Sequence, residues 1–197
     1  MVEFLKCQNL IQVMFKKCGV AISLGIMLGG NPTAIGENSI SKSDSNIFNK
    51  SNKTEIDVLK ISIGGIKMRM KEKDIIEKLG KPKSRTIKYD NVCYVAYLTT
   101  WKYDGLEIGG ISQSNDFSKS QVHIIKASSS RYSTEKNVKV GDSMRKAQKA
   151  YSTSKFNSEM GKDENYLTYP NAAFGGLMFI GDKQMIIKEI SLSDASC

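Results

Sequence analysis

The sequence passes twice through the same succession of elements, and this recurrence constrains the fold more than any other feature. A helical pattern with one apolar face spans residues 71–79, and a second spans residues 143–151. Each is followed by strand-like runs in the same order. One unit alone is small for an independent core, which favours a single antiparallel sheet shared by both units, with the helices packed on one face. The sequence therefore predicts an α+β fold built from two tandem units, residues 57–135 and 136–197.

The strand-like runs are placed by their apolar and aromatic content. In the first unit they span residues 92–98, 100–103, 106–108 and 122–125. In the second unit they span residues 166–169, 177–180 and 185–190. Tyr169 corresponds to Tyr103 when the two units are matched. On the two helices, the periodicity predicts burial of Ile75, Leu79, Ala147 and Tyr151.

The first 36 residues have the pattern of an export signal. Lys16 and Lys17 precede an apolar stretch, residues 18–28, and a positive segment before an apolar one is typical of a secretory signal peptide. This stretch is shorter than the roughly 20 apolar residues that a membrane-spanning helix needs. The alternative is an N-terminal helix buried in the fold. The sequence favours export, and a mature form without a membrane span.

The end of the predicted signal is marked by small residues. Ala34 and Gly36 fit cleavage before Glu37. Met14 would begin a signal of ordinary length and is an alternative start of the protein. Residues 37–56 are rich in Ser, Asn and Lys and poor in apolar residues, which predicts a flexible tether. A secreted or cell-envelope location follows from these features.

Cleavage at this position would leave two cysteines, Cys93 and Cys197. In an oxidising compartment two thiols can pair, so a disulfide between them is one interpretation. The alternative is two unpaired thiols, with Cys93 serving as a small buried apolar residue.

No pattern in the sequence indicates catalysis. His123 is the single histidine, which excludes a site with several histidine ligands, and the scattered cysteines exclude a zinc ribbon. Ser-x-x-Lys pairs occur about as often as chance predicts, and no Lys-Thr-Gly triad accompanies them. Cys93 and His123 both fall on predicted strands, whereas a catalytic cysteine more often opens a helix. We therefore expect no enzyme activity, no cofactor and no metal.

Several motifs resemble a known superfamily. In the first unit they are the helix and its Leu-Gly-Lys-Pro end, residues 75–82, and the aromatic strand, residues 101–103. In the second unit they are residues 141–144, Tyr169 and residues 185–190. This pattern resembles one repeat of the β-lactamase-inhibitor-protein-like superfamily, and in single copy the SmpA/OmlA lipoprotein of the outer-membrane barrel-assembly machinery. The resemblance implies a tandem α+β fold and a protein that binds another protein, as an inhibitor does.

Aromatic residues on the strands supply candidates for that binding. If the helices cover one face of the sheet, the other face stays open to a partner. Trp101 and Tyr103 share one side of their strand, and Tyr169 is the duplicate of Tyr103. We take these three rings as the expected partner-binding anchors, because aromatic side chains dominate binding hot spots. The rival assignment places them against the helices.

A basic surface is the alternative site. The chain carries 29 Lys and Arg against 20 Asp and Glu, a net charge of +9, and most of the cations are lysines. Nucleic-acid readers rely more on Arg, so we expect no nucleic-acid partner. The alternative is that the protein is attracted to an anionic surface of the cell envelope through basic residues on the side of its helices. The residues expected to form this surface are Lys78, Lys81, Lys83 and Arg85.

Overall fold

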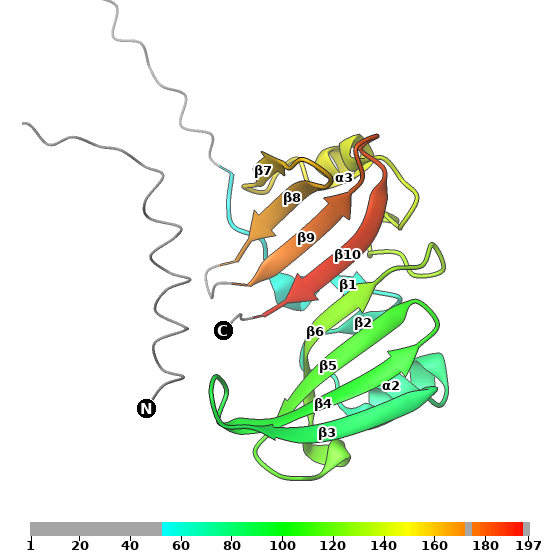
Figure 1. Cartoon of the computed structure of the whole chain (residues 1–197), viewed down its shortest axis with the longest axis vertical. Coiled ribbons are helices and arrows are strands. Elements are labelled where there is room, and N and C mark those ends of the chain that lie inside the picture. Colours follow the sequence, from blue (N-terminus) through cyan, green and yellow to red (C-terminus); the bar gives the residue numbers. More distant parts are fainter. Residues whose placement is uncertain (1–52, 172–174, 195–197) are drawn as a thin grey trace, which may run out of the picture. The chain divides into compact units, whose positions relative to one another are not determined.

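The computed structural model describes residues 53–171 and 175–194 (Figure 1). The predicted export signal, residues 1–36, lies outside the described residues, as do residues 37–52 of the predicted tether and Cys197. Among the helices of the described part, none combines the length and the apolar character needed to cross a membrane.

The described residues form two α-helices, two short 3-10 helices and ten strands. The first part of the chain contains a 3-10 helix (Val58–Lys60), β1 (Ser62–Ile63), β2 (Ile66–Lys67), α2 (Glu72–Leu79), β3 (Ser84–Asp90), β4 (Ala96–Tyr103), β5 (Leu106–Ser112), a second 3-10 helix (Phe117–Lys119) and β6 (Gln121–Ala127). The later part contains α3 (Met144–Ala150), β7 (Asn157–Met160), β8 (Asn165–Pro170), β9 (Gly176–Gly181) and β10 (Ile187–Ser193).

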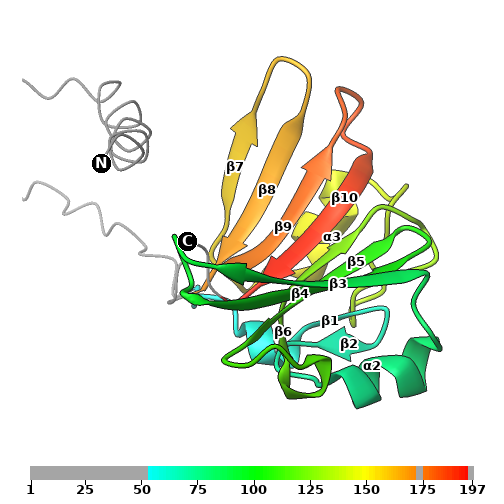
Figure 2. The same cartoon turned by 60° about the horizontal axis from the view of Figure 1, so that its bottom comes forward.

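Eight of these strands form one antiparallel sheet in the order β3-β4-β5-β6-β10-β9-β8-β7. Strands β1 and β2 form a separate hairpin. In the large sheet, strands β3 to β6 stay together and strands β7 to β10 stay together, and the two groups meet where β6 pairs with β10. The sheet twists strongly between its two ends (Figure 2). The predicted α+β class, with two helices and an antiparallel sheet, is confirmed.

Two strands of the large sheet and the short strands β1 and β2 were not predicted, and the two predicted runs at 92–98 and 100–103 are parts of the single strand β4. β3 and β7 form the two edges of the sheet, and their sequences carry few apolar residues, so the alternation that marks a strand is missing. The run predicted at 92–98 is wrong over its first half, because β4 begins only at Ala96. The first residues of that run form a turn instead. The Asp90 carboxylate accepts hydrogen bonds from the N–H groups of Val92, Cys93 and Tyr94 and holds them in this turn.

One face of the sheet carries a continuous buried row. The registers align Trp101 with Ile108, Ile125, Leu192, Leu177 and finally Tyr169, across six neighbouring strands. All of these side chains are fully buried. Trp101 contacts α2 and Tyr169 contacts α3, through hydrogen bonds to Glu72 and Ala147. Both helices therefore lie over this face, which we call the helix face, and the opposite side is the open face.

Helix α2 has local signals at both ends. The Asp74 carboxylate accepts a hydrogen bond from the Lys71 N–H at 3.0 Å, which fixes the first turn. Gly80 follows the helix with φ of 77°, a left-handed conformation that glycine adopts without strain. Ile75 is fully buried, as predicted, whereas Leu79 is only partly buried at the end of the helix.

Helix α3 begins at Ser143, whose side chain accepts a hydrogen bond from the Lys146 N–H. Ala147 and Tyr151 are buried, as predicted. The Tyr151 hydroxyl donates a hydrogen bond to Glu135 at 3.0 Å, and its ring packs against Tyr169 and Phe179. Burial is the main cause that raises the pKa of Tyr151 above its ordinary value, so the hydroxyl stays a donor.

Folded structure begins slightly before the predicted unit boundary. Thr54 lies beside Ser154 in a parallel bridge, and Lys155 donates its N–H to the Thr54 carbonyl at 2.9 Å. Ile56 is buried, and its N–H is bonded to the carbonyl of Pro170. The last residues of the predicted tether thus occupy the gap where β7 and β8 begin to separate.

Candidate functional site

The three aromatic side chains expected on the open face lie on the helix face. Trp101 is 0% exposed, and its Nε1–H donates to Glu72 Oε1 at 3.0 Å. The Tyr103 hydroxyl donates to the carbonyl of Gly80 at 3.0 Å, just beyond the end of α2. The Tyr169 hydroxyl donates to the carbonyl of Ala147, and burial raises the pKa of Tyr169 to about 12. Their placement as exposed anchors is wrong: they attach the two helices to the sheet.

Close packing explains why the Trp101 ring takes this side. A Cβ atom added at Gly110, which lies opposite Thr99 on β5, would lie 2.6 Å from the ring and 2.4 Å from Thr99 Oγ1. Only glycine leaves room for the indole there. The ring then meets Phe117 at 6.1 Å between centroids, and the guanidinium of Arg85 lies over that phenyl ring.

The open face carries an apolar group of its own. Leu98 on β4, Ile111 on β5 and Ile124 on β6 alternate with the buried row, so they point to the opposite side. Met178 and Ile180 on β9 continue the same face. All five side chains are partly buried and partly open to solvent. We call them the open-face apolar group.

Charged residues lie on the same face, in the cross-strand row that also holds Met178. A cross-strand row runs from Lys102 through Glu107 to Lys126, and Lys102 forms an ion pair with Glu107 at 3.1 Å. Both members of that pair are largely exposed, so the pair adds little stability. Its alternating charge is better suited to orienting a partner than to holding the sheet together.

The loop between β3 and β4 presents a second apolar surface. Tyr89, Val92 and Val95 are exposed by 55%, 78% and 59%. We call these three residues the hairpin tip. The predicted run at 92–98 had placed Val92 in a strand. Asp90 and Asn91, which precede it, are turn-forming residues and could have indicated a loop.

The hairpin tip is held in shape by Asp90. Its carboxylate accepts N–H hydrogen bonds from Tyr94 at 2.7 Å, Cys93 at 3.1 Å and Val92 at 3.3 Å. These bonds, led by that of Tyr94, hold the pKa of Asp90 below its ordinary value, while burial acts in the opposite direction. Val95 completes the turn with φ of 49°, which is strained for a β-branched residue.

Two further residues lie near this loop. His123 and Tyr94 stack edge to face at 5.2 Å between ring centroids, and burial lowers the pKa of His123, with Asp194 acting in the opposite sense. Cys93 is disulfide-bonded, so it is not a free nucleophile. Cys197 lies outside the described residues, and its pairing with Cys93 stays a prediction.

The four residues of the predicted basic surface are exposed, and two of them are paired with carboxylates. Lys83 forms an ion pair with Asp104, and Arg85 forms one with Glu72 at 2.6 Å. Lys78 and Lys81 form no ion pair with the part of the chain that the structure describes. The free positive charge at this place is therefore smaller than the sequence indicates.

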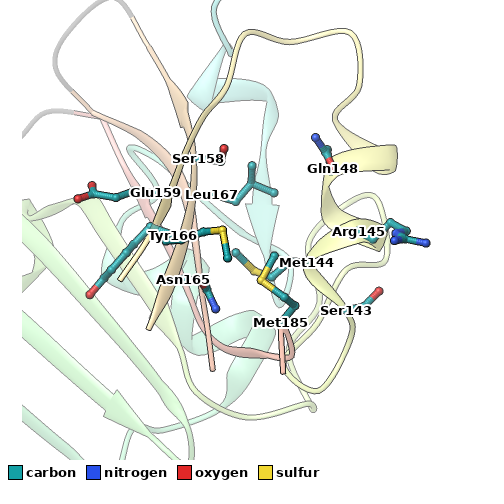
Figure 3. A pocket seen from close by; sticks show the side chains of 11 residues that line it. Ser143, Met144, Arg145, Gln148, Ser158, Glu159, Asn165, Tyr166, Leu167 and Met185 are labelled. Carbon is teal, nitrogen blue, oxygen red and sulfur yellow. The ribbon is translucent and has the colours of Figure 1, made fainter. Parts of the chain in front are cut away.

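A pocket of about 530 Å³ lies between α3 and the end strands β7 and β8 (Figure 3). Sequence analysis did not single it out, because its lining comes from four separate elements. Its apolar lining consists of Met144, Met160, Met185 and Leu167. Its other lining residues are polar or charged and include Arg145 and Gln148 of α3.

The described residues contain no group of three or more His, Cys, Asp or Glu side chains that could hold a metal ion. Comparison of the chain with protein-family models, with curated proteins and with solved structures found no match.

Proposed function

We propose that this protein is an exported, non-enzymatic binding protein that recognises another protein through the open face of its sheet. The observation that carries the proposal is the open-face apolar group, which leaves five aliphatic or thioether side chains partly exposed on one surface. Apolar side chains that are exposed beside charged residues are found at protein interaction sites.

The hairpin tip adds a second apolar surface, in which Tyr89 lies opposite Tyr97 on the helix face. Its three apolar side chains are exposed, and the hydrogen bonds to Asp90 hold the loop in one conformation before any partner arrives. A rigid loop loses less conformational entropy on binding than a mobile one. The hairpin tip therefore replaces Trp101, Tyr103 and Tyr169 in the proposed set of anchors.

The fold can be described as two tandem units, each a helix followed by four strands, joined edge to edge at β6 and β10. This architecture supports the resemblance to the inhibitor-protein superfamily, and it extends the proposal to inhibition of the bound protein. A secreted or envelope location, after removal of residues 1–36, belongs to the same proposal.

The test starts with a partner captured from the extracellular fraction of the producing cells by the full chain. Two double variants are then compared with the unaltered protein, Val92→Ser with Val95→Ser, and Ile111→Ser with Ile124→Ser. We expect each to weaken binding about tenfold or more, equivalent to about 1.4 kcal/mol. Unfolding midpoints of the hairpin-tip variant should change little, because those side chains are exposed.

The matched control is Lys78→Gln with Lys81→Gln, on the side of α2. If this control loses binding and the two apolar variants keep it, the open-face proposal is wrong. If the captured partner is an enzyme, its activity in the presence of excess protein tests the inhibitor-like form of the proposal.

The second candidate function is contact with an anionic envelope surface. Lys78 and Lys81 favour it, since neither is paired with a carboxylate among the described residues. Vesicles containing phosphatidylglycerol are a suitable probe. Binding should fall steeply with added salt and should depend on these two lysines rather than on Val92.

A further inference from the structure

We propose that the free edge of β7, together with the methionine-lined pocket beside it, binds an extended segment of another protein that carries an apolar side chain two positions from an acidic one. This surface differs from the open face, because the pocket lies between the end of the sheet and α3 (Figure 3).

The backbone of β7 has unused hydrogen-bonding groups. β7 ends the strand order, and no described strand lies beyond it. The N–H of Gly161 donates to the Glu164 carbonyl at 2.8 Å, which makes these two residues a hydrogen-bonded pair. Pairs alternate in an antiparallel ladder, so Glu159 bonds to β8, while the N–H and C=O groups of Ser158 and Met160 point away from it. Such an edge is a template for an added strand.

The same register places the side chains of Ser158 and Met160 on the helix face. Ser158 lies opposite Leu167, and Met160 lies opposite Asn165. In an added antiparallel strand, the residues opposite Ser158 and Met160 would project from this same face, two positions apart. Their side chains would therefore be directed toward the pocket rather than toward the open face.

The pocket is suited to an apolar side chain. Met160 is 82% exposed and Met185 is 41% exposed, although both line the pocket with the buried Met144. Thioether side chains are flexible and polarizable, so they adjust to apolar groups of different shapes. Met185 is also held at φ of 61° in the turn before β10, which is an unusual conformation for a non-glycine residue.

Charge adds the second requirement on the partner. Arg145 of α3 lines the pocket and is exposed, and the described residues provide no carboxylate paired with it. Glu159 is the one acidic residue in the lining, and its register opposite Tyr166 places it on the other face of the sheet. A partner segment with an acidic side chain two positions from its apolar one, so that both face the pocket, is therefore favoured.

The two edges of the sheet differ in a way that supports this choice. β3, at the far edge, carries Arg85 and Lys88, and cationic residues on an edge oppose pairing with another chain. β7 has neither lysine nor arginine. However, β7 is short, and a short edge strand can itself prevent pairing with another chain. Saturable binding of a peptide with the required side chains would show that the edge accepts a partner strand rather than resisting one.

The experiment uses the full chain labelled with nitrogen-15 and the capped peptide acetyl-Thr-Glu-Thr-Leu-Thr-amide, in which Glu and Leu project from the same face of the strand. We expect saturable binding that slows amide hydrogen exchange at Ser158 and Met160 by about tenfold or more. Exchange at Asn157 and Glu159 should stay unchanged, because those amides already bond to β8. A peptide with Lys in place of Glu should bind more weakly.

Variants identify the contacts. Ser158→Pro should abolish binding by removing one edge N–H. Met160→Ser, at an exposed position that folding does not need, should weaken binding about fivefold or more. Arg145→Gln should remove the preference for the acidic peptide. Glu77→Gln, at an exposed position on α2 outside the pocket lining, is the control and should bind like the unaltered chain.

Three outcomes would overturn the proposal. The first is slow exchange at Ser158 and Met160 before peptide is added, which would mean that the chain covers its own edge. The second is a dimer in equilibrium sedimentation that Ser158→Pro dissociates, which would assign the edge to a second copy. The third is the absence of saturable protection at these two amides.

Discussion

Trp101 and Tyr169 stand in one cross-strand row of the sheet, and each donates a hydrogen bond to a different helix. Trp101 Nε1 bonds to the Glu72 carboxylate of α2, and the Tyr169 hydroxyl bonds to the Ala147 carbonyl of α3. Buried aliphatic residues fill the row between them. The helices are thus positioned from the two ends of one continuous layer, which makes these rings structural.

Removal of the Trp101 side chain should therefore reduce stability. We expect Trp101→Ala to lower the free energy of unfolding by about 3–5 kcal/mol, because the indole is fully buried. Urea denaturation measures the loss. Leu98→Ala, on the same strand but on the open face, should cost less. A loss below about 1 kcal/mol for Trp101→Ala would contradict the assignment of this ring to the core.

The strain at Val95 can be relieved by glycine. Val95→Gly should raise the free energy of unfolding by about 0.5–1 kcal/mol, because φ of 49° is unfavourable for valine and costs glycine little. Val92→Gly is the matched control in the same loop and should not stabilise the protein. Thermal and urea unfolding of both variants provide the comparison, and equal effects at the two positions would show that the strain is not relieved.

The hairpin tip should loosen at low pH. Since the folded-state pKa of Asp90 is lowered, its contribution is fully present above the ordinary value of 3.8 and is lost as pH falls through the lower folded value. Amide exchange at Val92, Cys93 and Tyr94 should accelerate over that range, after correction for the intrinsic pH dependence. Asp90→Asn should remove this pH-dependent change in exchange. If the change persists in the variant, a group other than Asp90 causes it.

His123 should make the fold less stable in mild acid. Burial lowers its folded-state pKa, so the unfolded chain binds more protons once pH drops below the ordinary value of 6.5. The free energy of unfolding should then fall until pH reaches the folded-state pKa. Urea midpoints for the unaltered chain and for His123→Gln, recorded at about pH 7.5 and about pH 5, measure the effect. An identical pH response in both would exclude His123 as its source.

The identity of the Cys93 partner can be read from mass. We expect a disulfide with Cys197 in the mature protein, and hence a gain of about 2 Da on reduction and one linked peptide pair after proteolysis. Closure of a loop of about 100 residues would contribute up to about 4–5 kcal/mol in the chain-entropy model. Cys197→Ser should lower the free energy of unfolding by no more than that amount, and two alkylated thiols in unreduced protein would exclude the bond.

The parts of the fold that sequence reasoning placed correctly are those with strong local signals. Ile75 recurs at helical spacing with its neighbours, and Gly80 ends the helix, so α2 was predicted almost to the residue. β3 and β7 were missed because edge strands need no apolar alternation. The local sequence therefore does not indicate which segments form the edge strands of the sheet.

The aromatic site illustrates the same limit. Alternation correctly placed Trp101 and Tyr103 on one side of their strand, but it could not tell which side faces the helices. That choice depends on Glu72 and on the room that Gly110 leaves, which lie far apart in sequence from one another. The pocket beside β7 was not predicted for the same reason, since it exists only where α3 and two strands converge.

The position of β10 has a consequence for how the chain reaches its native state. β10 follows every other described strand in the sequence, yet it lies in the middle of the sheet, between β6 and β9. Until it is synthesised, both halves lack their central neighbour, and the edge of β6 stays unpaired. Cooperative folding must then wait for nearly the whole polypeptide, as the proposed export of the chain before it folds would require.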